Sequence, residues 1–262
     1  MSVIPVIQPD PRPLRKAPVG LVACQVNFSE TDRRIVGKDV FKFQEALSRG
    51  GGDYSELTPF RKGQVTLQIG LLGATSSSDA TSSSGWRFAN HDQTWSVALF
   101  PDSVILESRA YAGWTESFKP RLEAAVTSVI EVFRPDIETR LGLRYINALS
   151  DEQAASATFW RSKVQGAFLG PLGHENVGDG FKGSALRANF AFDHVEANVS
   201  LAFQPDAVYQ GNTAVVFDID VFRHTPQEMN ISKVLSGADI LNTVALRIFQ
   251  DIITPEYLEE LR

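Results

Sequence analysis

The pattern of apolar and polar positions repeats along the chain at one constant spacing. Residues 22–28 alternate apolar and polar side chains as a half-buried strand does, and so do residues 141–147, which lie 141 − 22 = 119 positions later. A helical apolar stripe starts at Leu122 and a second starts at Leu241, again 241 − 122 = 119 positions later. Equal offsets for a strand and for a helix predict a tandem duplication.

Each half of the chain predicts the same succession of elements. A strand is followed by a helix, then by several strands with period-two alternation, and then by the long helix. Because each strand has one apolar side and each long helix one apolar stripe, we expect the helices to cover antiparallel sheets. The predicted fold class is α+β, a tandem duplication of a β-α-β(3-4)-α unit with curved antiparallel sheets each covered by a long helix. This topology is similar to a TBP-like (TATA-binding-protein-like) or helix-grip-like unit, and the similarity carries no function with it.

The domain organisation follows from the prolines and from the repeat. Five prolines between positions 5 and 18 keep the first segment extended, so residues 1–16 are expected to form a Pro-rich arm. The arm is either a loose terminus or a segment that contacts a partner. Residues 17–135 then form the first α+β repeat and residues 136–262 the second.

Four local features are expected inside the repeats. The pattern predicts a strand over residues 64–72 and a helix around residues 154–168, and Asp193 to Glu196 should be a hairpin turn. Residues 74–85 carry six serines and nothing that packs into a core, which favours a flexible loop. A phosphorylated or ligand-closing loop is the alternative.

Composition narrows the classes of function. With 262 residues, 43% hydrophobic and 21% charged, the chain is expected to fold as an ordinary globular protein. Its net charge of −6 argues against broad binding of nucleic-acid backbones, which requires basic residues. A single cysteine, Cys24, rules out an intramolecular disulfide and suits the reducing cytoplasm, where we expect the protein to reside. No apolar run approaches the ~18 residues that span a bilayer, and residues 1–8 lack the basic start of a signal peptide.

Several segments together resemble one sporadically distributed, functionally uncharacterised bacterial family of roughly this length. The most specific is Gly142-Leu-Arg-Tyr-Ile-Asn147, and weaker matches include Ala23-Cys-Gln-Val-Asn-Phe28, Trp86-Arg-Phe88 and Leu106-Glu-Ser108. The resemblance implies a compact bacterial protein and transfers no catalytic residue. A sporadic distribution suggests an accessory or mobile-element role, including conflict with phage.

Asp218 and Asp220 are the candidate metal ligands. Residues two apart on a strand project from the same face, and paired carboxylates can hold a hard cation. A solvated sheet face or salt bridges to arginines is the alternative interpretation. The four histidines, at positions 91, 174, 194 and 224, lack the spacing of metal ligands, and Cys24 is expected to be a buried, inert thiol.

A set of polar and aromatic side chains on strands is the candidate binding site. Arginine among aromatic neighbours recognises carboxylates or phosphates, or else forms structural salt bridges with glutamate. The candidate residues are Trp86, Arg87, Glu107, Arg109, Arg144, Tyr145 and Asn147.

Three functional hypotheses result. The leading one is a non-enzymatic binding or interaction protein with a protein partner, encoded nearby in the genome, or a small ligand. The others are a metal-dependent hydrolase that uses Asp218 and Asp220, and a carrier of a small apolar ligand in a cavity lined by Trp114, Phe118 and Phe249. We expect no cofactor, no membrane association and no nucleic-acid partner, and a homo-oligomer is left open.

Overall fold

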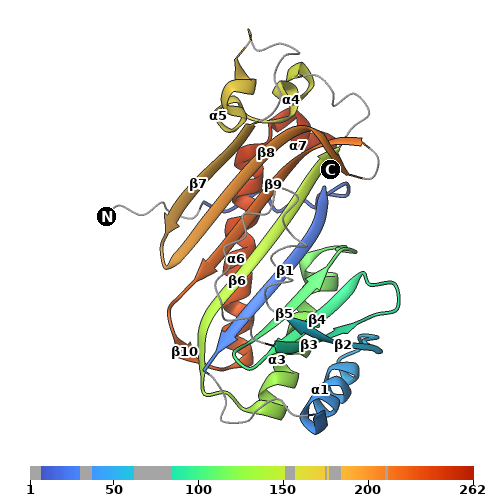
Figure 1. The fold of residues 1–262 in the computed structure, drawn as a ribbon. Helices are drawn as coiled ribbons and strands as arrows, with labels where there is room; N and C mark the ends of the chain where they lie inside the picture. Colours follow the sequence, from blue (N-terminus) through green and yellow to red (C-terminus); the bar gives the residue numbers. More distant parts are fainter. Residues whose placement is uncertain are drawn as a thin grey trace. The chain divides into compact units, whose positions relative to one another are not determined.

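The computed structural model describes residues 7–29, 37–61, 84–150, 157–174, 176, 184–209 and 212–262. The described residues form antiparallel strands and several helices, so the α+β class is confirmed (Figure 1). The expected strand at residues 64–72 and residues 74–83 of the expected serine-rich loop lie outside the described residues. The last two residues of that expected loop, Ser84 and Gly85, instead begin strand β3 (Ser84–Ala89). No helix in the described part of the chain is both long enough and apolar enough to cross a membrane.

The chain folds into two compact units that interleave in sequence. The terminal unit consists of Met1–Gly20, Arg144–Val221 and Leu241–Arg262. The central unit consists of Leu21–Leu143 and Phe222–Ile240. Strands β1 (Val19–Phe28), β6 (Ile137–Ser150) and β9 (Asn212–Arg223) and helix α6 (Ile231–Ile252) pass from one unit into the other.

The sheet of the central unit has the strand order β2-β3-β4-β5-β1-β6. β3, β4 and β5 form a meander, because they pair antiparallel with their chain neighbours. β5 then pairs antiparallel with β1, with Val26 opposite Val104. The remaining strands of this unit are β2 (Glu56–Arg61), β3 (Ser84–Ala89), β4 (Trp95–Phe100), β5 (Ser103–Ser108) and the short β10 (Gln227–Glu228), which pairs with β6.

The central unit has two amphipathic helices and a short π-helical turn. Helices α1 (Gly37–Arg49) and α3 (Lys119–Phe133) each bury one apolar stripe, and the rings of Phe43 and Phe133 lie 6.1 Å apart between them. A π-helical turn, η1 (Trp114–Phe118), leads into α3. The C-cap residue of α3 is Arg134, which adopts φ 52° directly before Pro135, a residue that disfavours a helical conformation in its predecessor.

The sheet of the terminal unit has the strand order β6-β9-β8-β7. Strands β7 (Ser184–Phe192) and β8 (Val195–Tyr209) form the expected hairpin, in which Phe192 lies opposite Val195 and His194 takes φ 59° in the turn. Val216 and Phe222, on the other face of β9, are buried as well. Alternate residues of β8 and β9 form the buried face that the period-two pattern predicts. They are Ala197, Val199, Leu201, Val215, Phe217, Ile219 and Val221.

The helix expected around residues 154–168 is interrupted. The structure has α4 (Ala157–Lys163) and α5 (Gly166–Leu169), followed by a 3-10 turn, η2 (Gly170–Gly173). Between them Val164 forms a β-bridge with Ile253, and the Gln165 amide donates to the Ile252 carbonyl at 2.8 Å. A tertiary hydrogen bond therefore replaces the helical one at this position.

The described part of the Pro-rich arm contacts the chain's own C-terminal region. The backbone amide of Asp10 donates to Gln250 Oε1 at 2.8 Å, and that of Lys16 donates to the Leu261 carbonyl at 2.9 Å. Arg12 also pairs with Glu259, near the end of α7 (Pro255–Glu260). Hydrogen bonds thus hold this part of the arm against the chain's own C-terminal region. The sequence suggests either a loose terminus or a segment that contacts a partner, and neither alternative includes this contact.

The order of elements agrees between the halves of the sequence. β1, α1, β2 to β5 and α3 are followed by β6, α4, β7 to β9 and α6, with further short elements in the second series. The tandem duplication and the TBP-like topology stay predictions. Superposition of residues 17–134 on residues 139–254 tests them.

Candidate functional site

Two members of the predicted binding set share one face of the central sheet. Arg87 on β3 lies opposite Ala98, and Ala98 lies opposite Ile105 on β5, so Glu107 is two residues further along the same face. Both side chains are half-buried. This face also carries a small buried cluster of Ala98, Phe100 and Ile105, against which Phe60 packs.

Polar neighbours engage both of these charged side chains. Arg87 Nη1 donates to Gln93 Oε1 at 2.5 Å, and the Gln93 amide donates in turn to Glu56. Glu107 Oε2 accepts from the Ser96 hydroxyl at 3.3 Å. Trp86 points to the opposite face by strand alternation, and Arg109 lies exposed beyond the end of β5. The four central-unit candidates therefore do not form one cluster.

The terminal-unit candidates divide over two sheet faces in the same way. Arg144 on β6 binds Asp218 on β9 with two hydrogen bonds, Nε to Oδ1 at 2.7 Å and Nη2 to Oδ2 at 2.5 Å. Tyr145 points to the other face, where its hydroxyl donates to Asn242 Oδ1 at 2.8 Å. Asn147 is buried on the face of Tyr145.

One of the paired aspartates, Asp218, forms a salt bridge with Arg144. Both carboxylate oxygens of Asp218 accept from Arg144, and Asp220 is half-buried on the same face of β9. No group of three or more His, Cys, Asp or Glu residues that could hold a metal ion occurs among the described residues.

The remaining candidates for chemistry are exposed or inert. The side chains of His91 and His194 are 94% and 86% exposed, and each lies beside an acidic side chain. Cys24 is fully buried, and burial raises the pKa of its thiol to about 12. The expectation of a buried thiol is confirmed, and burial disfavours the thiolate, which is the good nucleophile.

Two of the three aromatic residues proposed for a carrier cavity, Trp114 and Phe118, pack against each other. Phe118 is fully buried and stacks on Trp114 with ring centroids 5.6 Å apart. Trp114 Nε1 donates to Asp239 at 2.8 Å, and Lys119 Nζ binds the same carboxylate at 2.7 Å. The third residue of that proposal, Phe249, belongs to the terminal unit.

Sequence reasoning missed a buried charged group in the central unit. The side chain of Glu138 on β6 is 0% exposed, and its Oε2 accepts from Arg223 Nη2 at 2.8 Å and from Gln227 Nε2 at 2.7 Å. Burial raises the pKa of this carboxyl, and the Arg223 charge partly opposes the rise. Its Oε1 has no hydrogen-bond partner among the described residues. Arg223 and Gln227 lie 85 and 89 positions away in the sequence, so no local sequence pattern predicts these hydrogen bonds.

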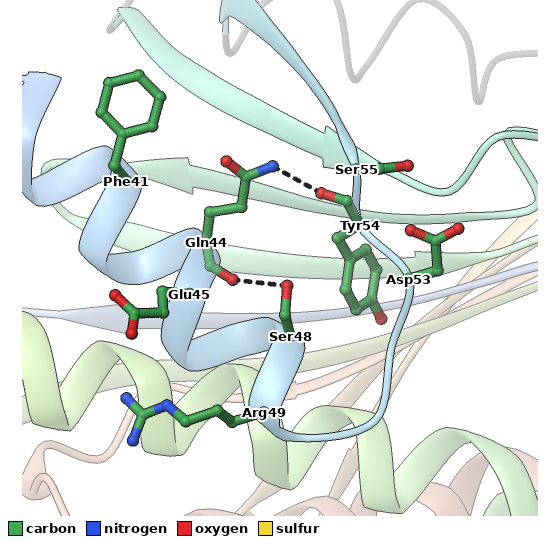
Figure 2. Close-up of a pocket in the computed structure, with 8 residues that line it drawn as sticks. All are labelled: Phe41, Gln44, Glu45, Ser48, Arg49, Asp53, Tyr54 and Ser55. Atoms are coloured by element: carbon green, nitrogen blue, oxygen red, sulfur yellow. Dashed lines mark hydrogen bonds between the residues drawn. The ribbon is translucent and has the colours of Figure 1, made fainter.

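Sequence reasoning also missed a depression on the surface of α1. It has a volume of about 560 Å³ and lies between α1 and residues 53–55, which lead into β2 (Figure 2). The Gln44 side chain donates to the Tyr54 carbonyl at 2.9 Å and so ties the helix to the opposite wall. The lining residues are Phe41, Gln44, Glu45, Ser48, Arg49, Asp53, Tyr54 and Ser55.

The walls of this depression differ in chemistry. Phe41 is 63% exposed, although its neighbours Val40 and Phe43 are buried on the inner face of α1. Tyr54 is buried, its hydroxyl has no hydrogen-bond partner among the described residues, and burial raises its pKa to about 12. Gln44 lies between these two aromatic side chains, and the other lining residues are polar or charged (Figure 2).

Charge in the depression is predominantly negative. Glu45 and Asp53 are both exposed carboxylates. The nearby cation, Arg49, donates to Glu131 Oε1 on α3 at 2.6 Å, so its charge is shared with a group outside the depression. The surface combines an exposed aromatic ring with carboxylates, an arrangement suited to a cation that carries an apolar stem.

Comparisons with known proteins add no further assignment. The scan against protein-family models and the search of curated proteins both gave no match.

Proposed function

We propose that the protein is a non-enzymatic binding protein that recognises a protein partner through the depression beside α1. The observation that carries the proposal is Phe41. This aromatic side chain is 63% exposed on the outer face of an amphipathic helix, so most of its apolar surface is open to a partner. At interfaces, aromatic side chains next to a pocket are the residues that contribute most to binding.

The proposed partner segment carries an arginine or lysine next to an apolar residue. Glu45 and Asp53 supply negative charge, and Phe41 offers a ring face for a guanidinium or for an aliphatic stem. The Gln44 hydrogen bond fixes the two walls relative to one another, which lowers the ordering cost of binding. A role in bacterial accessory or defence-type systems stays a prediction that the family resemblance alone supports.

A peptide selection tests this function. Random peptides selected on immobilised wild-type protein are titrated against wild type, Phe41→Ala and Glu45→Lys, with Ile240→Ala as the matched control. Ile240 belongs to the same unit, and it is an exposed apolar residue, 52% exposed, that does not line the depression.

We expect the selected peptides to pair a basic residue with an apolar one. Phe41→Ala should weaken their binding by about tenfold or more, and Ile240→Ala should leave it unchanged. Peptides that bind Phe41→Ala as tightly as wild type would overturn the proposal, and so would a selection that yields no binder.

A further inference from the structure

Strand β7 is the last strand in the order of the terminal unit. On one side, β7 pairs with β8 along the whole length of β7, from Ser184 opposite Phe203 to Phe192 opposite Val195. No strand of the described chain pairs with its other side. Its outward amide and carbonyl groups therefore present a strand-length set of hydrogen-bonding groups.

The core of the terminal unit stops abruptly at this strand. Leu186, Ala188 and Phe190 are only half-buried. The residues directly opposite them on β8 are 0 to 1% exposed, so burial is complete one strand further in. Those residues are Leu201, Val199 and Ala197. A strand added outside β7 would bury the half-exposed side chains of β7 as β7 buries those of β8.

The features that block edge pairing are lacking in β7. Natural edge strands are shortened or carry proline and charged residues that prevent pairing. β2, the other end of the described strand order, has six residues and includes Glu56, Pro59 and Arg61. β7 has nine residues, no proline and a single charged residue, Arg187.

We propose that β7 pairs antiparallel with β7 of a second copy of this chain, about a two-fold axis at Ala188. Antiparallel pairing places residues i and j opposite each other on the same face. Centred on Ala188, it puts Leu186 opposite Phe190 of the other copy, and Phe190 opposite Leu186. The apolar faces of the two sheets then lie on the same side, and a continuous sheet results.

Charge selects this register, and the self-complementary placement of the half-buried Leu186 and Phe190 in it favours a second copy as the occupant. In the centred register each Arg187 lies opposite an Asn189, a neutral partner, and every residue of β7 has a partner. A shift that centres the pairing on Arg187 places two guanidinium groups opposite each other, which is destabilising. η2 contacts β7, so the proposal rests on the five central residues of the strand, 186–190.

Oligomeric state and its response to charge test the proposal. Sedimentation velocity over a range of concentrations should show a reversible dimer for the full chain. Asn189→Arg places arginine opposite arginine twice, and should weaken the dimer by about 2- to 30-fold. Adding Arg187→Glu to that variant creates two opposite-charge pairs and should restore dimerisation. Circular dichroism of each variant confirms that the fold is retained.

A position-specific disulfide tests the register. The Ala188 Cα atoms should lie about 4.5 to 5.5 Å apart across the axis, within the range that a disulfide spans. Mild oxidation of Ala188→Cys should therefore give a covalent dimer, whereas Asn189→Cys, whose two copies lie diagonally, should give little. Native Cys24 is buried and does not interfere.

Two outcomes overturn the proposal. One is a wild-type chain that stays monomeric at every concentration. The other is a dimer that neither charge variant alters and that position 188 does not cross-link more readily than position 189.

Discussion

Arg144 on β6 holds Asp218 on β9 by a two-point hydrogen bond, with the arginine side chain 29% exposed and the aspartate 22% exposed. The pair links two strands whose residues are 74 positions apart in the sequence. It joins one proposed binding residue to one proposed metal ligand, and each satisfies the other. The structure thus favours the salt-bridge interpretation of both residues.

Arg144→Ala should lower the free energy of unfolding by about 1–3 kcal/mol, because it leaves a half-buried carboxylate without its charged donor. Arg144→Lys should recover only part of the loss, since an ammonium group cannot bind both carboxylate oxygens in the same planar geometry. Urea denaturation monitored by circular dichroism measures both variants.

Arg247→Ala is the matched control for this change. Arg247 also binds a carboxylate at two points, that of Asp251, but the pair is local to one turn of α6. Arg247→Ala should therefore lower the free energy of unfolding by about 0.5 kcal/mol or less. Equal losses for Arg144 and Arg247 would show that the β6–β9 pair has no special role.

Glu138→Gln should change how stability depends on pH. Burial raises the pKa of Glu138 above its unfolded value of 4.5, so between the two pKa values the folded state binds a proton that the unfolded state has lost. The contribution of Glu138 to stability is therefore complete below pH 4.5 and declines as pH rises through the raised pKa. The free energy of unfolding of wild type minus that of Glu138→Gln should therefore decrease as pH rises from 4.5 through the raised pKa.

Urea unfolding of both proteins at a series of pH values measures that difference. Glu123→Gln, an exposed change on α3, is the control and should show no such trend. A difference that grows with pH would mean that the Arg223 charge outweighs burial and lowers the pKa instead.

Gly237→Ala should destabilise the protein even though alanine favours helices. A Cβ at this position of α6 would lie 2.8 Å from Arg223 Nη2 and 3.0 Å from Leu141 Cδ2. Moving the guanidinium would disturb its bond to the buried Glu138, so the expected loss is about 1–3 kcal/mol. Thermal unfolding measures the change.

Coupling to Arg223 identifies the cause of that loss. In an Arg223→Ala background the same glycine substitution should cost less, because the obstructing side chain is gone. Gly166→Ala is the control, since a Cβ there meets nothing within 4 Å. Equal losses in both backgrounds would place the obstruction at Leu141.

Cys24 should react with Ellman's reagent far more slowly in the native protein than in urea. Its thiol is 0% exposed, and its pKa of about 12 leaves almost no thiolate near neutral pH. The absorbance of the released chromophore follows the reaction. Rapid stoichiometric labelling without denaturant would show that β1 opens readily.

Local sequence determined the elements of this protein and the side of each that is buried. The stripe of α3, the proline that ends it and the alternation along β8 and β9 all depend on neighbours within a few positions, and the structure confirms them. The exposed histidines and the buried cysteine follow from the same local patterns.

Tertiary structure decided which elements meet, and with that the roles of the charged residues. Alternation says that Arg144 and Asp218 each leave the apolar face of a strand, but not that β6 and β9 are neighbours. Tertiary structure also decided the burial of Glu138 and the exposure of Phe41. Glu138 is buried because β10 and Arg223 reach it, whereas Phe41 is exposed although it is apolar. Strand order and long-range pairing depend on free energy summed over the whole fold, which a short window of sequence does not contain.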